Sequence, residues 1–212
     1  RVEHYFDRSA TKVWERLTSD APVSRIRQTV REGRDRMRAL MLSRLPQDLS
    51  GRRVLDAGCG AGQMTVELAA RGADVVAVDI SPALVEIARA RLPAAHANQV
   101  TFASGDMTAD HGHFDHVLAM DSLIYYNTKD ITAALNRLGE RTQGTVVFTV
   151  APKTAFLMTF WTMGKLFPRA DRSPIMVPHA FGTLQRAAGG QLAKIGRVSC
   201  GFYISECLEF KP

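Results

Sequence analysis

The segment VLDAGCGAG (54–62) decides the fold, because an apolar run leads into Asp56 and then into three closely spaced glycines. Gly58, Gly60 and Gly62 allow the backbone to turn tightly and allow a ligand to approach it closely. An apolar strand that runs into such a turn and then into a helix is typical of the first unit of an open α/β sheet, whose ligands bind at the carboxyl ends of the strands. The segment therefore predicts a ligand site around residues 56–62.

Strands and helices alternate on the C-terminal side of this loop, which favours parallel pairing with right-handed crossovers. Strands are predicted at 52–58, 73–79, 99–106, 114–121 and 144–152, and helices at 61–71, 82–91 and 129–141. Two β stretches in 194–210 are expected to complete the sheet as an antiparallel pair. The predicted fold is a doubly wound, Rossmann-like α/β fold with a mainly parallel seven-stranded sheet and an antiparallel C-terminal strand.

The whole chain, 1–212, is predicted to form one domain with four parts. Two helices are expected before the first strand, at 2–18 and 23–45, and Pro46 should end the second one. The parts are a helical arm (1–48), a cofactor-binding core (49–152), an inserted apolar segment that covers the substrate (153–190) and a C-terminal β pair (191–212).

Composition is that of an ordinary globular protein, with 46% hydrophobic and 23% charged residues. Three cysteines, an odd number without a CxxC pair, argue against a disulfide scaffold or a zinc site and favour a reducing compartment. No apolar stretch is long enough to span a membrane, and the first residues do not read as a charged-then-apolar leader, so we expect no signal peptide in these residues. We expect a cytoplasmic protein.

Residues 1–53 carry the whole net charge of +6, since they hold twelve Arg and one Lys against seven Asp and Glu. This excess predicts an acidic partner: a carboxylate substrate, an anionic membrane surface or a nucleic acid. The alternative is a basic helix face that only contacts water. Nucleic acid ranks last and is not expected, because the helix at 23–45 lacks interleaved aromatic residues.

Two cofactor classes compete for the glycine-rich loop. Dinucleotide folds have the spacing G-x-G-x-x-G, with a pyrophosphate on the helix N-terminus. Here the spacing is G-x-G-x-G, and Asp56 would repel a pyrophosphate. S-adenosylmethionine has no phosphate and carries a sulfonium and an ammonium group, so an acidic residue at this point attracts it. The charge of Asp56 therefore favours S-adenosylmethionine.

Three further acids follow the next three predicted strands. Asp79 comes twenty-three residues after Asp56 and can accept hydrogen bonds from both ribose hydroxyls. Asp106 suits the adenine amino group, with Met107 against the ring, and Asp121 faces the same cleft. Each acid alone could be a helix cap or a loop residue. Four of them at the carboxyl ends of four successive strands predict one ligand site.

The segments LDAGCGAG (55–62), VVAVD (75–79), SGDM (104–107) and FDHVLAMD (114–121) resemble the class I methyltransferases over roughly residues 50–152. The resemblance implies methyl transfer from S-adenosylmethionine, which leaves S-adenosylhomocysteine. The residues expected to contact the cofactor are Asp56, Gly58, Cys59, Gly60, Asp79, Ile80, Asp106, Met107, Asp121 and Ser122.

The methyl acceptor must be inferred from segments outside this core. No Asn-Pro-Pro-Tyr or Asp-Pro-Pro-Tyr stretch follows the fourth strand, which disfavours methylation of DNA amino groups. The segment 152–169 is rich in aromatic and aliphatic residues, and Lys153, Lys165, Arg169 and Arg172 border it. This segment could pack on the sheet, insert shallowly into a membrane or cover a large flat apolar ligand. An apolar wall with cationic edges suits a planar hydrophobic molecule that carries carboxylates.

Six segments across the chain resemble the magnesium-protoporphyrin IX methyltransferases of the bacteriochlorophyll pathway. They are RVEHYFDRSATKVWERL (1–17), IRQTVREGRDRMRA (26–39), MDSLIYYN (120–127), VAPKTAF (150–156), LFPRADRSP (166–174) and GFYISECLEF (201–210). The resemblance implies methylation of one propionate carboxylate of magnesium-protoporphyrin IX to the monomethyl ester. Candidate partners are the porphyrin-binding subunit of magnesium chelatase and a membrane surface that the protein would contact peripherally.

The same resemblance suggests roles for individual residues. Tyr5 and Phe6 resemble an arm that closes over the cofactor, and Tyr125 stands where some members have His. Tyr5 and Tyr125 are thus the catalytic candidates, and the substrate-binding candidates are Tyr126, Lys153, Phe156, Phe160 and Trp161. No protein-held metal is expected, because magnesium arrives inside the porphyrin. His4 and His179 are possible axial contacts to it, or else surface or capping histidines.

Two other functions stay open at this stage. One is a methyltransferase for another apolar acid or a quinone, built on the same core. The other is a non-catalytic carrier that passes the porphyrin between enzymes, although the intact set of four acids argues against it.

Overall fold

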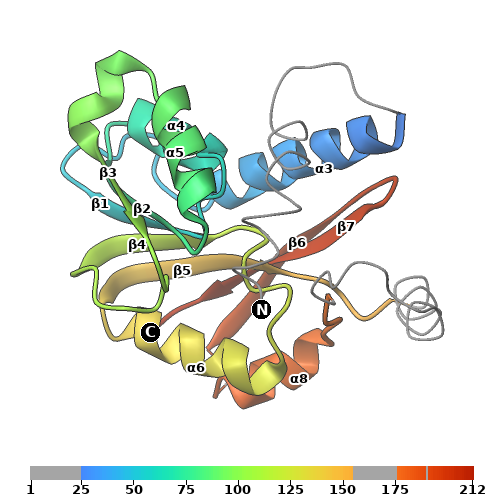
Figure 1. Cartoon of the computed structure of the whole chain (residues 1–212). Coiled ribbons are helices and arrows are strands. Elements are labelled where there is room, and N and C mark those ends of the chain that lie inside the picture. Colours follow the sequence, from blue (N-terminus) through green and yellow to red (C-terminus); the bar gives the residue numbers. More distant parts are fainter. Residues whose placement is uncertain (1–24, 155–175, 190) are drawn as a thin grey trace.

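A computed structural model describes residues 25–154, 176–189 and 191–212. Figure 1 shows that these residues form one twisted sheet with helices on both faces. The predicted helix at 2–18 and the candidates Tyr5, Phe156, Phe160 and Trp161 lie outside the described residues.

The sheet has seven strands in the order β3-β2-β1-β4-β5-β7-β6. The strands are β1 (Arg53–Ala57), β2 (Asp74–Asp79), β3 (Val100–Ser104), β4 (Phe114–Ala119), β5 (Thr142–Val150), β6 (Leu192–Cys200) and β7 (Tyr203–Phe210). The first five pair in parallel, and β7 lies antiparallel between β5 and β6. This arrangement confirms the predicted mainly parallel sheet with an antiparallel C-terminal strand.

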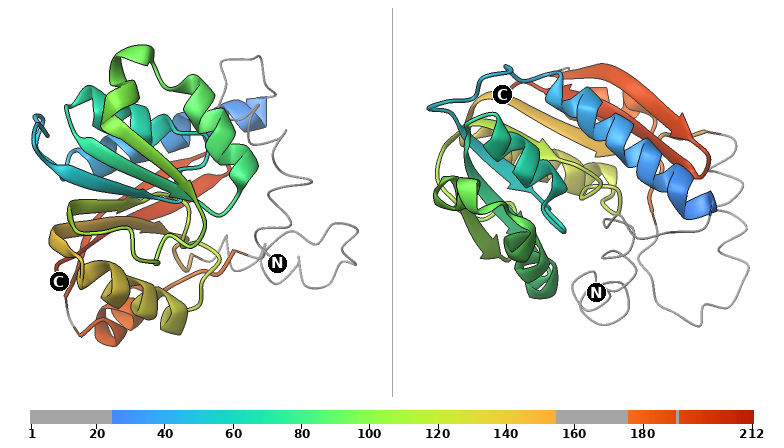
Figure 2. Two further views of the ribbon diagram at one scale, coloured as in Figure 1. Left: turned by 60° about the vertical axis from the view of Figure 1, so that its left-hand side comes forward. Right: turned by 90° about the horizontal axis from the view of Figure 1, so that it is seen from above.

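Helices cover both faces of the sheet, as two further views show (Figure 2). They are α3 (Arg25–Leu42), α4 (Gln63–Ala70), α5 (Pro82–Arg91), the 3-10 helix η2 (Ala94–Gln99), α6 (Thr128–Gly139) and α8 (Phe181–Ala187). The sequence did not predict η2. No helix in the described part of the chain combines the length and the apolar character needed to cross a membrane.

The helix predicted at 23–45 ends at Leu42. Beyond Leu42 the N–H of Arg44 donates to the carbonyl of Met41 at 3.0 Å, and that of Leu45 to Leu42 at 3.3 Å. These are tight turns of the 3-10 type. The ring of Pro46 disfavours the α conformation at Leu45, so the helix ends before the proline.

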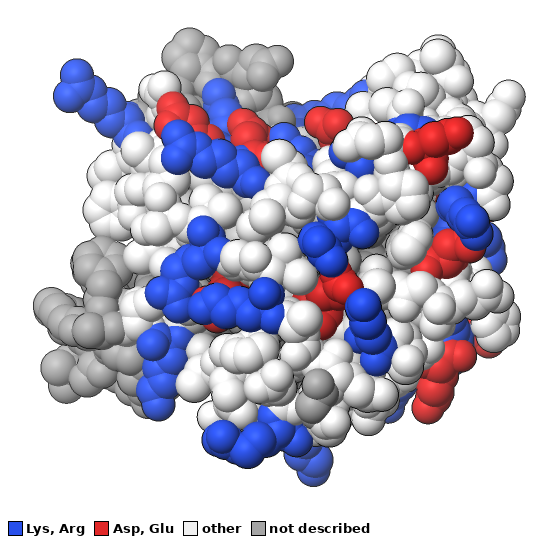
Figure 3. Space-filling view, turned by 180° about the vertical axis from the view of Figure 1, so that it is seen from behind, with Lys and Arg blue, Asp and Glu red and all other residues white. Residues whose placement is uncertain are grey.

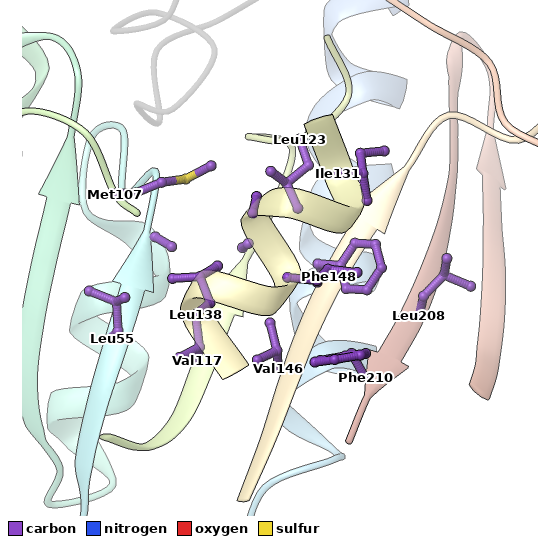
Figure 4. Close-up of a cluster of buried hydrophobic side chains, with 14 of the residues drawn as sticks. Leu55, Met107, Val117, Leu123, Ile131, Leu138, Val146, Phe148, Leu208 and Phe210 are labelled. Atoms are coloured by element: carbon purple, nitrogen blue, oxygen red, sulfur yellow. The ribbon is translucent and has the colours of Figure 1, made fainter. Parts of the chain in front are cut away.

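Successive strand residues alternate between two hydrophobic cores, one on each face of the sheet. Val54 packs on the face covered by α3 and α4, and Leu55 on the face covered by α6 and α8. In β5, Val147 belongs to the first core, whereas Val146 and Phe148 belong to the second. Figure 4 shows the second core, in which α6 lies over β4 and β5. Burial on both faces explains why these strands read as continuous apolar runs.

Gly33 sets how closely α3 approaches the sheet. A Cβ atom at this position would lie 2.6 Å from Cδ1 of Tyr203 on β7, so only glycine lets the helix rest on the tyrosine ring. Arg34 and Arg38 follow on the same helix and line the pocket described below. Helix α3 is therefore part of the wall of the site.

Candidate functional site

Four carboxylates lie in spatial order along the carboxyl edge of the sheet. Asp56 is in β1 and Asp79 ends β2, while Asp106 and Asp121 each follow the end of a strand, β3 and β4, by two residues. The strand order β3-β2-β1-β4 places them in the sequence Asp106, Asp79, Asp56, Asp121 across the edge. Adjacent strands are about 4.8 Å apart, so the two outer strands of this set, β3 and β4, are about 14 Å apart.

A pocket of about 460 Å³ opens at this edge. Its volume is in the range of small-molecule sites. All ten residues predicted to contact the cofactor line it, together with Tyr125 and Tyr126. The structure thus brings these residues together, while their individual contacts with a ligand stay predictions.

The glycine-rich loop leaves space that a ligand can fill. Gly60 and Gly105 both have positive φ and line the pocket, and a Cβ atom on either would meet no protein atom within 4 Å. Gly58 differs, because a Cβ atom there would collide with the side chain of Ser122. The open cradle at Gly60 and Gly105 fits an extended ligand such as S-adenosylmethionine lying along the sheet edge.

Asp79 braces this loop from the neighbouring strand. Its Oδ2 accepts a hydrogen bond from the N–H of Gly60 at 2.8 Å, and its Oδ1 accepts one from the N–H of Ser81 at 2.9 Å. Ser81 in turn caps α5, since its Oγ accepts from the N–H of Leu84. The carboxylate is therefore held in place before any ligand arrives.

Asp56 is completely buried beneath the loop. Thr65 Oγ1 donates a hydrogen bond to its Oδ2 at 2.6 Å. Burial raises the pKa of Asp56 to about 7, and the Thr65 hydrogen bond lowers it only in part. Near neutral pH this acid therefore carries a fraction of a charge, and a bound cation would favour its ionised form.

We expect the ligand-free protein to lose stability as Asp56 ionises. Because its pKa is raised on folding, the contribution to the free energy of unfolding is fully present below the ordinary pKa of Asp and is lost as the pH rises through about 7. The loss between pH 5 and pH 8 should be roughly 2–3 kcal/mol. Urea unfolding at the two pH values measures it.

Asp56→Asn is the matched variant, since it keeps an acceptor for the Thr65 hydroxyl but cannot ionise. Its stability should change less between pH 5 and pH 8 than that of the wild type, by the amount given above. Parallel curves for the two proteins would contradict the assigned pKa.

Asp121 is held by side chains from three elements. Arg34 Nε on α3 donates to its Oδ2 at 3.1 Å, and the Tyr203 hydroxyl on β7 donates to its Oδ1 at 3.0 Å. Thr149 Oγ1 on β5 donates to Oδ1 at 3.2 Å and accepts from the backbone N–H of Asp121 at 2.8 Å. Asp121 also has a φ of 55°, in the left-handed region that favours glycine. Its charge is thus compensated within the protein.

The Tyr125–Tyr126 loop is fastened by the segment after residue 175. The N–H of Val177 donates to the carbonyl of Ile124 at 2.8 Å, and His179 Nε2 bonds the carbonyl of Tyr126 at 2.9 Å. His179 is 5% exposed, and its Nδ1 lies 3.4 Å from Thr128 Oγ1. The expectation of a surface histidine is therefore wrong, since the side chain is buried and both ring nitrogens face protein groups. Contact of His179 with the porphyrin magnesium stays a prediction.

Lys153, a predicted substrate contact, is exposed and does not line the pocket. Its backbone N–H donates to the carbonyl of His179 at 2.7 Å. Its role in substrate binding stays a prediction, as do those of Tyr5, Phe156, Phe160 and Trp161, which the structure does not describe.

The sequence did not point to Arg34 and Arg38 as pocket residues, although both line it. The signal was present in their spacing of four residues, which places both on one face of a helix. It was hidden among the other arginines of the same helix. Further residues of the pocket wall that were missed are Ala61, Gln63, Met64, Leu84, Gly105 and Met120.

Two family models match the chain. Residues 54–143 match the model described as "Methyltransferase domain", and residues 119–212 match "Magnesium-protoporphyrin IX methyltransferase C-terminus". The magnesium-protoporphyrin O-methyltransferase of Rhodobacter capsulatus is 65% identical, over 100% of this chain and 96% of the relative.

Solved structures agree with these matches. A crystal structure of magnesium protoporphyrin IX methyltransferase from Synechocystis PCC 6803 with bound S-adenosylhomocysteine superposes with a TM-score of 0.84 at 29% identity, covering 100% of this chain and 98% of the other. The same enzyme with bound S-adenosylmethionine gives a TM-score of 0.78 at 27% identity, covering 100% and 95%. The chain therefore belongs to the magnesium-protoporphyrin IX methyltransferase family and has the fold of an S-adenosylmethionine-dependent methyltransferase.

Proposed function

We propose that this chain transfers a methyl group from S-adenosylmethionine to a propionate carboxylate of magnesium-protoporphyrin IX and so forms the monomethyl ester. The observation that carries the proposal is that one pocket is lined by all ten predicted cofactor contacts, two tyrosines and two arginines. The names of the relatives given above specify magnesium-protoporphyrin as their substrate. One of them matches this chain from end to end.

The four carboxylates give the pocket a direction, with one end for the cofactor adenosine and the other for the methyl acceptor. Asp106 and Asp79, on the β3 and β2 side, would hold the adenine and the ribose, and Asp56 would lie near the charged amino-acid end. S-adenosylmethionine supplies the methyl group on a positively charged sulfur. The β4 side of the pocket, with Asp121, Ser122, Tyr125 and Tyr126, then faces the methyl acceptor.

Methylation of a carboxylate needs no general base. A propionate has a pKa close to that of Glu, about 4.3, and is ionised at neutral pH. The protein's task is to hold the attacking oxygen in line with the methyl group in a site that excludes water. The hydroxyls of Tyr125 and Tyr126 are suited to orienting such an oxygen. The phenol of Tyr126 is protonated at neutral pH, and its partial burial raises its pKa further above the ordinary value.

We assign the remaining candidate residues either to covering the substrate or to closing the site over the cofactor. Residues 153–190, with Lys153, Phe156, Phe160 and Trp161, would cover the porphyrin, while Tyr5 in the arm 1–48 would close over the cofactor. The core 49–152 and the β pair 191–212 would form the fixed part of the site.

Basic side chains support contact with an acidic partner, such as the porphyrin-binding subunit of magnesium chelatase or an anionic membrane surface. In the middle of the face shown in Figure 3, Lys and Arg side chains lie around partly hidden acidic side chains. On β6, Lys194 and Arg197 lie 2.6 Å and 3.0 Å from the buried Glu206, and Arg44 lies 2.8 Å from the buried Glu209. The cations stay at the surface, since their side chains are each about 40% exposed.

The reaction tests the proposal directly. Incubation of the protein with S-adenosylmethionine and magnesium-protoporphyrin IX should give a pigment heavier by one methylene unit, detected by mass spectrometry. The dimethyl ester of the same pigment has no free carboxylate and should gain nothing. Bound but unmethylated pigment would favour a carrier instead, and methylation of other apolar acids alone would overturn the substrate assignment.

A further inference from the structure

Helix α3 places two guanidinium groups in the pocket wall, those of Arg34 and Arg38. They are the Lys and Arg residues that line the pocket within the described part of the chain. The Arg34 side chain is 17% exposed, and the Asp121 side chain to which it is bonded is 8% exposed. An ion pair this sheltered is weakly screened by solvent and has a defined geometry.

Asp121 is fixed independently of Arg34. Tyr203 and Thr149 donate to its Oδ1, at 3.0 Å and 3.2 Å, while Arg34 donates to its Oδ2. The Tyr203 ring in turn lies against Gly33, the residue before Arg34. The Asp121 carboxylate is therefore fixed by its other partners and holds the Arg34 guanidinium at one place on the pocket wall.

That place is the end of the pocket where the methyl group is transferred. Asp121 follows β4, three strands away from β3 and Asp106, which mark the adenine end under the proposed function. Ser122, Tyr125 and Tyr126 line the same end. An acceptor entering the pocket meets Arg34 there.

An anionic acceptor faces an electrostatic conflict in this pocket. Asp56, Asp79 and Asp106 favour binding of the cationic methyl donor but repel the carboxylate of the methyl acceptor. A free guanidinium would attract the acceptor, yet it would also withdraw electron density from the attacking oxygen. An arginine already paired with an aspartate avoids both problems, because it still donates directed hydrogen bonds while the pair has a net charge close to zero.

We propose that the Arg34–Asp121 ion pair recognises the carboxylate of the methyl acceptor, with Arg34 donating a hydrogen bond to it and Asp121 positioning Arg34 and limiting its positive charge. This inference rests on the proposed function. In the step itself a lone pair of the carboxylate oxygen forms the new O–CH₃ bond. The S–CH₃ bond breaks and its electrons stay on sulfur, so a neutral ester and a neutral thioether result and no proton moves.

The two partners have opposite expected effects, which separates recognition from a merely structural role. At saturating S-adenosylmethionine, Arg34→Met should raise the KM for magnesium-protoporphyrin IX at least about 10-fold, because a charged hydrogen bond is lost. Asp121→Asn keeps the bonds from Tyr203 and Thr149 but leaves the guanidinium uncompensated. It should leave KM equal or lower and reduce kcat at least about 10-fold.

Arg36→Met is the matched control, because Arg36 is an exposed residue of the same helix; it should leave both constants unchanged. Arg34→Lys, which retains the charge, should recover part of the loss in KM. The proposal is overturned if Arg34→Met leaves KM unchanged, or if both partners' variants raise KM and lower kcat together. Wild-type protein that forms no ester would instead refute the proposed function.

Discussion

Replacing Asp79 by Ala should weaken the binding of S-adenosylhomocysteine at least about 100-fold. The carboxylate is 8% exposed and fixes the glycine-rich loop through the N–H of Gly60. Under the proposed function it also accepts two ribose hydroxyls. Hydrogen bonds to charged groups contribute about 1.5–3 kcal/mol each, so the loss of both ligand bonds and of the loop contact exceeds 2.7 kcal/mol, about 100-fold. Calorimetric titration measures the affinity.

Asp74→Ala provides the control on the same strand. Asp74 begins β2, its side chain is 61% exposed, and its ion pair with Arg53 is 3.5 Å long. Its loss should not change the affinity. Asp79→Asn should fall between the wild type and Asp79→Ala, since the amide retains one acceptor oxygen. Affinity of Asp79→Ala within threefold of the wild type would remove Asp79 from the cofactor site.

Most of the fold could be predicted from the sequence, because this fold depends on local patterns of apolar residues. Strands buried on both faces read as apolar runs, and β1, β2 and β4 were predicted to within two residues. The early end of α3 and the 3-10 helix η2 were missed, because they depend on turn geometry around Pro46 and Pro93. Burial of Glu206 and Glu209 in β7 was not predictable either, since it depends on cations from β6 and from the turn after α3.

The site was predictable where one loop or one strand end defines it. All ten expected cofactor residues line one pocket, because the carboxyl ends of parallel strands meet at one edge. The spacing of Arg34 and Arg38 puts them on one helix face, but it does not show that this face lines the pocket. The position of Arg34 depends on Gly33 packing against Tyr203, a contact between residues 170 positions apart.

The pocket is also less acidic than four carboxylates suggest. Asp56 has a pKa of about 7, and Asp121 is paired with Arg34. Such compensation depends on burial and on distant partners, neither of which sequence spacing reveals. A site with moderate negative charge can bind a sulfonium cation and then an anionic methyl acceptor. Four free carboxylates would repel that acceptor.

Gly60→Ala should abolish most cofactor binding while it changes stability little. Gly60 has a φ of 52°, and an added Cβ atom would meet no protein atom within 4 Å. The left-handed backbone costs an alanine about 1 kcal/mol. The added methyl group, however, would occupy the open space in the pocket where we expect the ligand to lie close to the backbone. We expect affinity for S-adenosylhomocysteine to fall at least about 30-fold, measured by calorimetry beside a urea unfolding curve.

Gly51→Ala separates the two effects, because Gly51 has a φ of 72° and equally open surroundings but lies outside the pocket. Both variants should lose about 1 kcal/mol of stability for the same conformational reason. Only Gly60→Ala should lose affinity. Equal affinities for the two would mean that the ligand does not pass close to Gly60, and the cradle would then lie elsewhere. A selective loss at Gly60 would place the ligand against the turn that follows β1, since both glycines have positive φ and an added Cβ atom meets no protein atom within 4 Å at either.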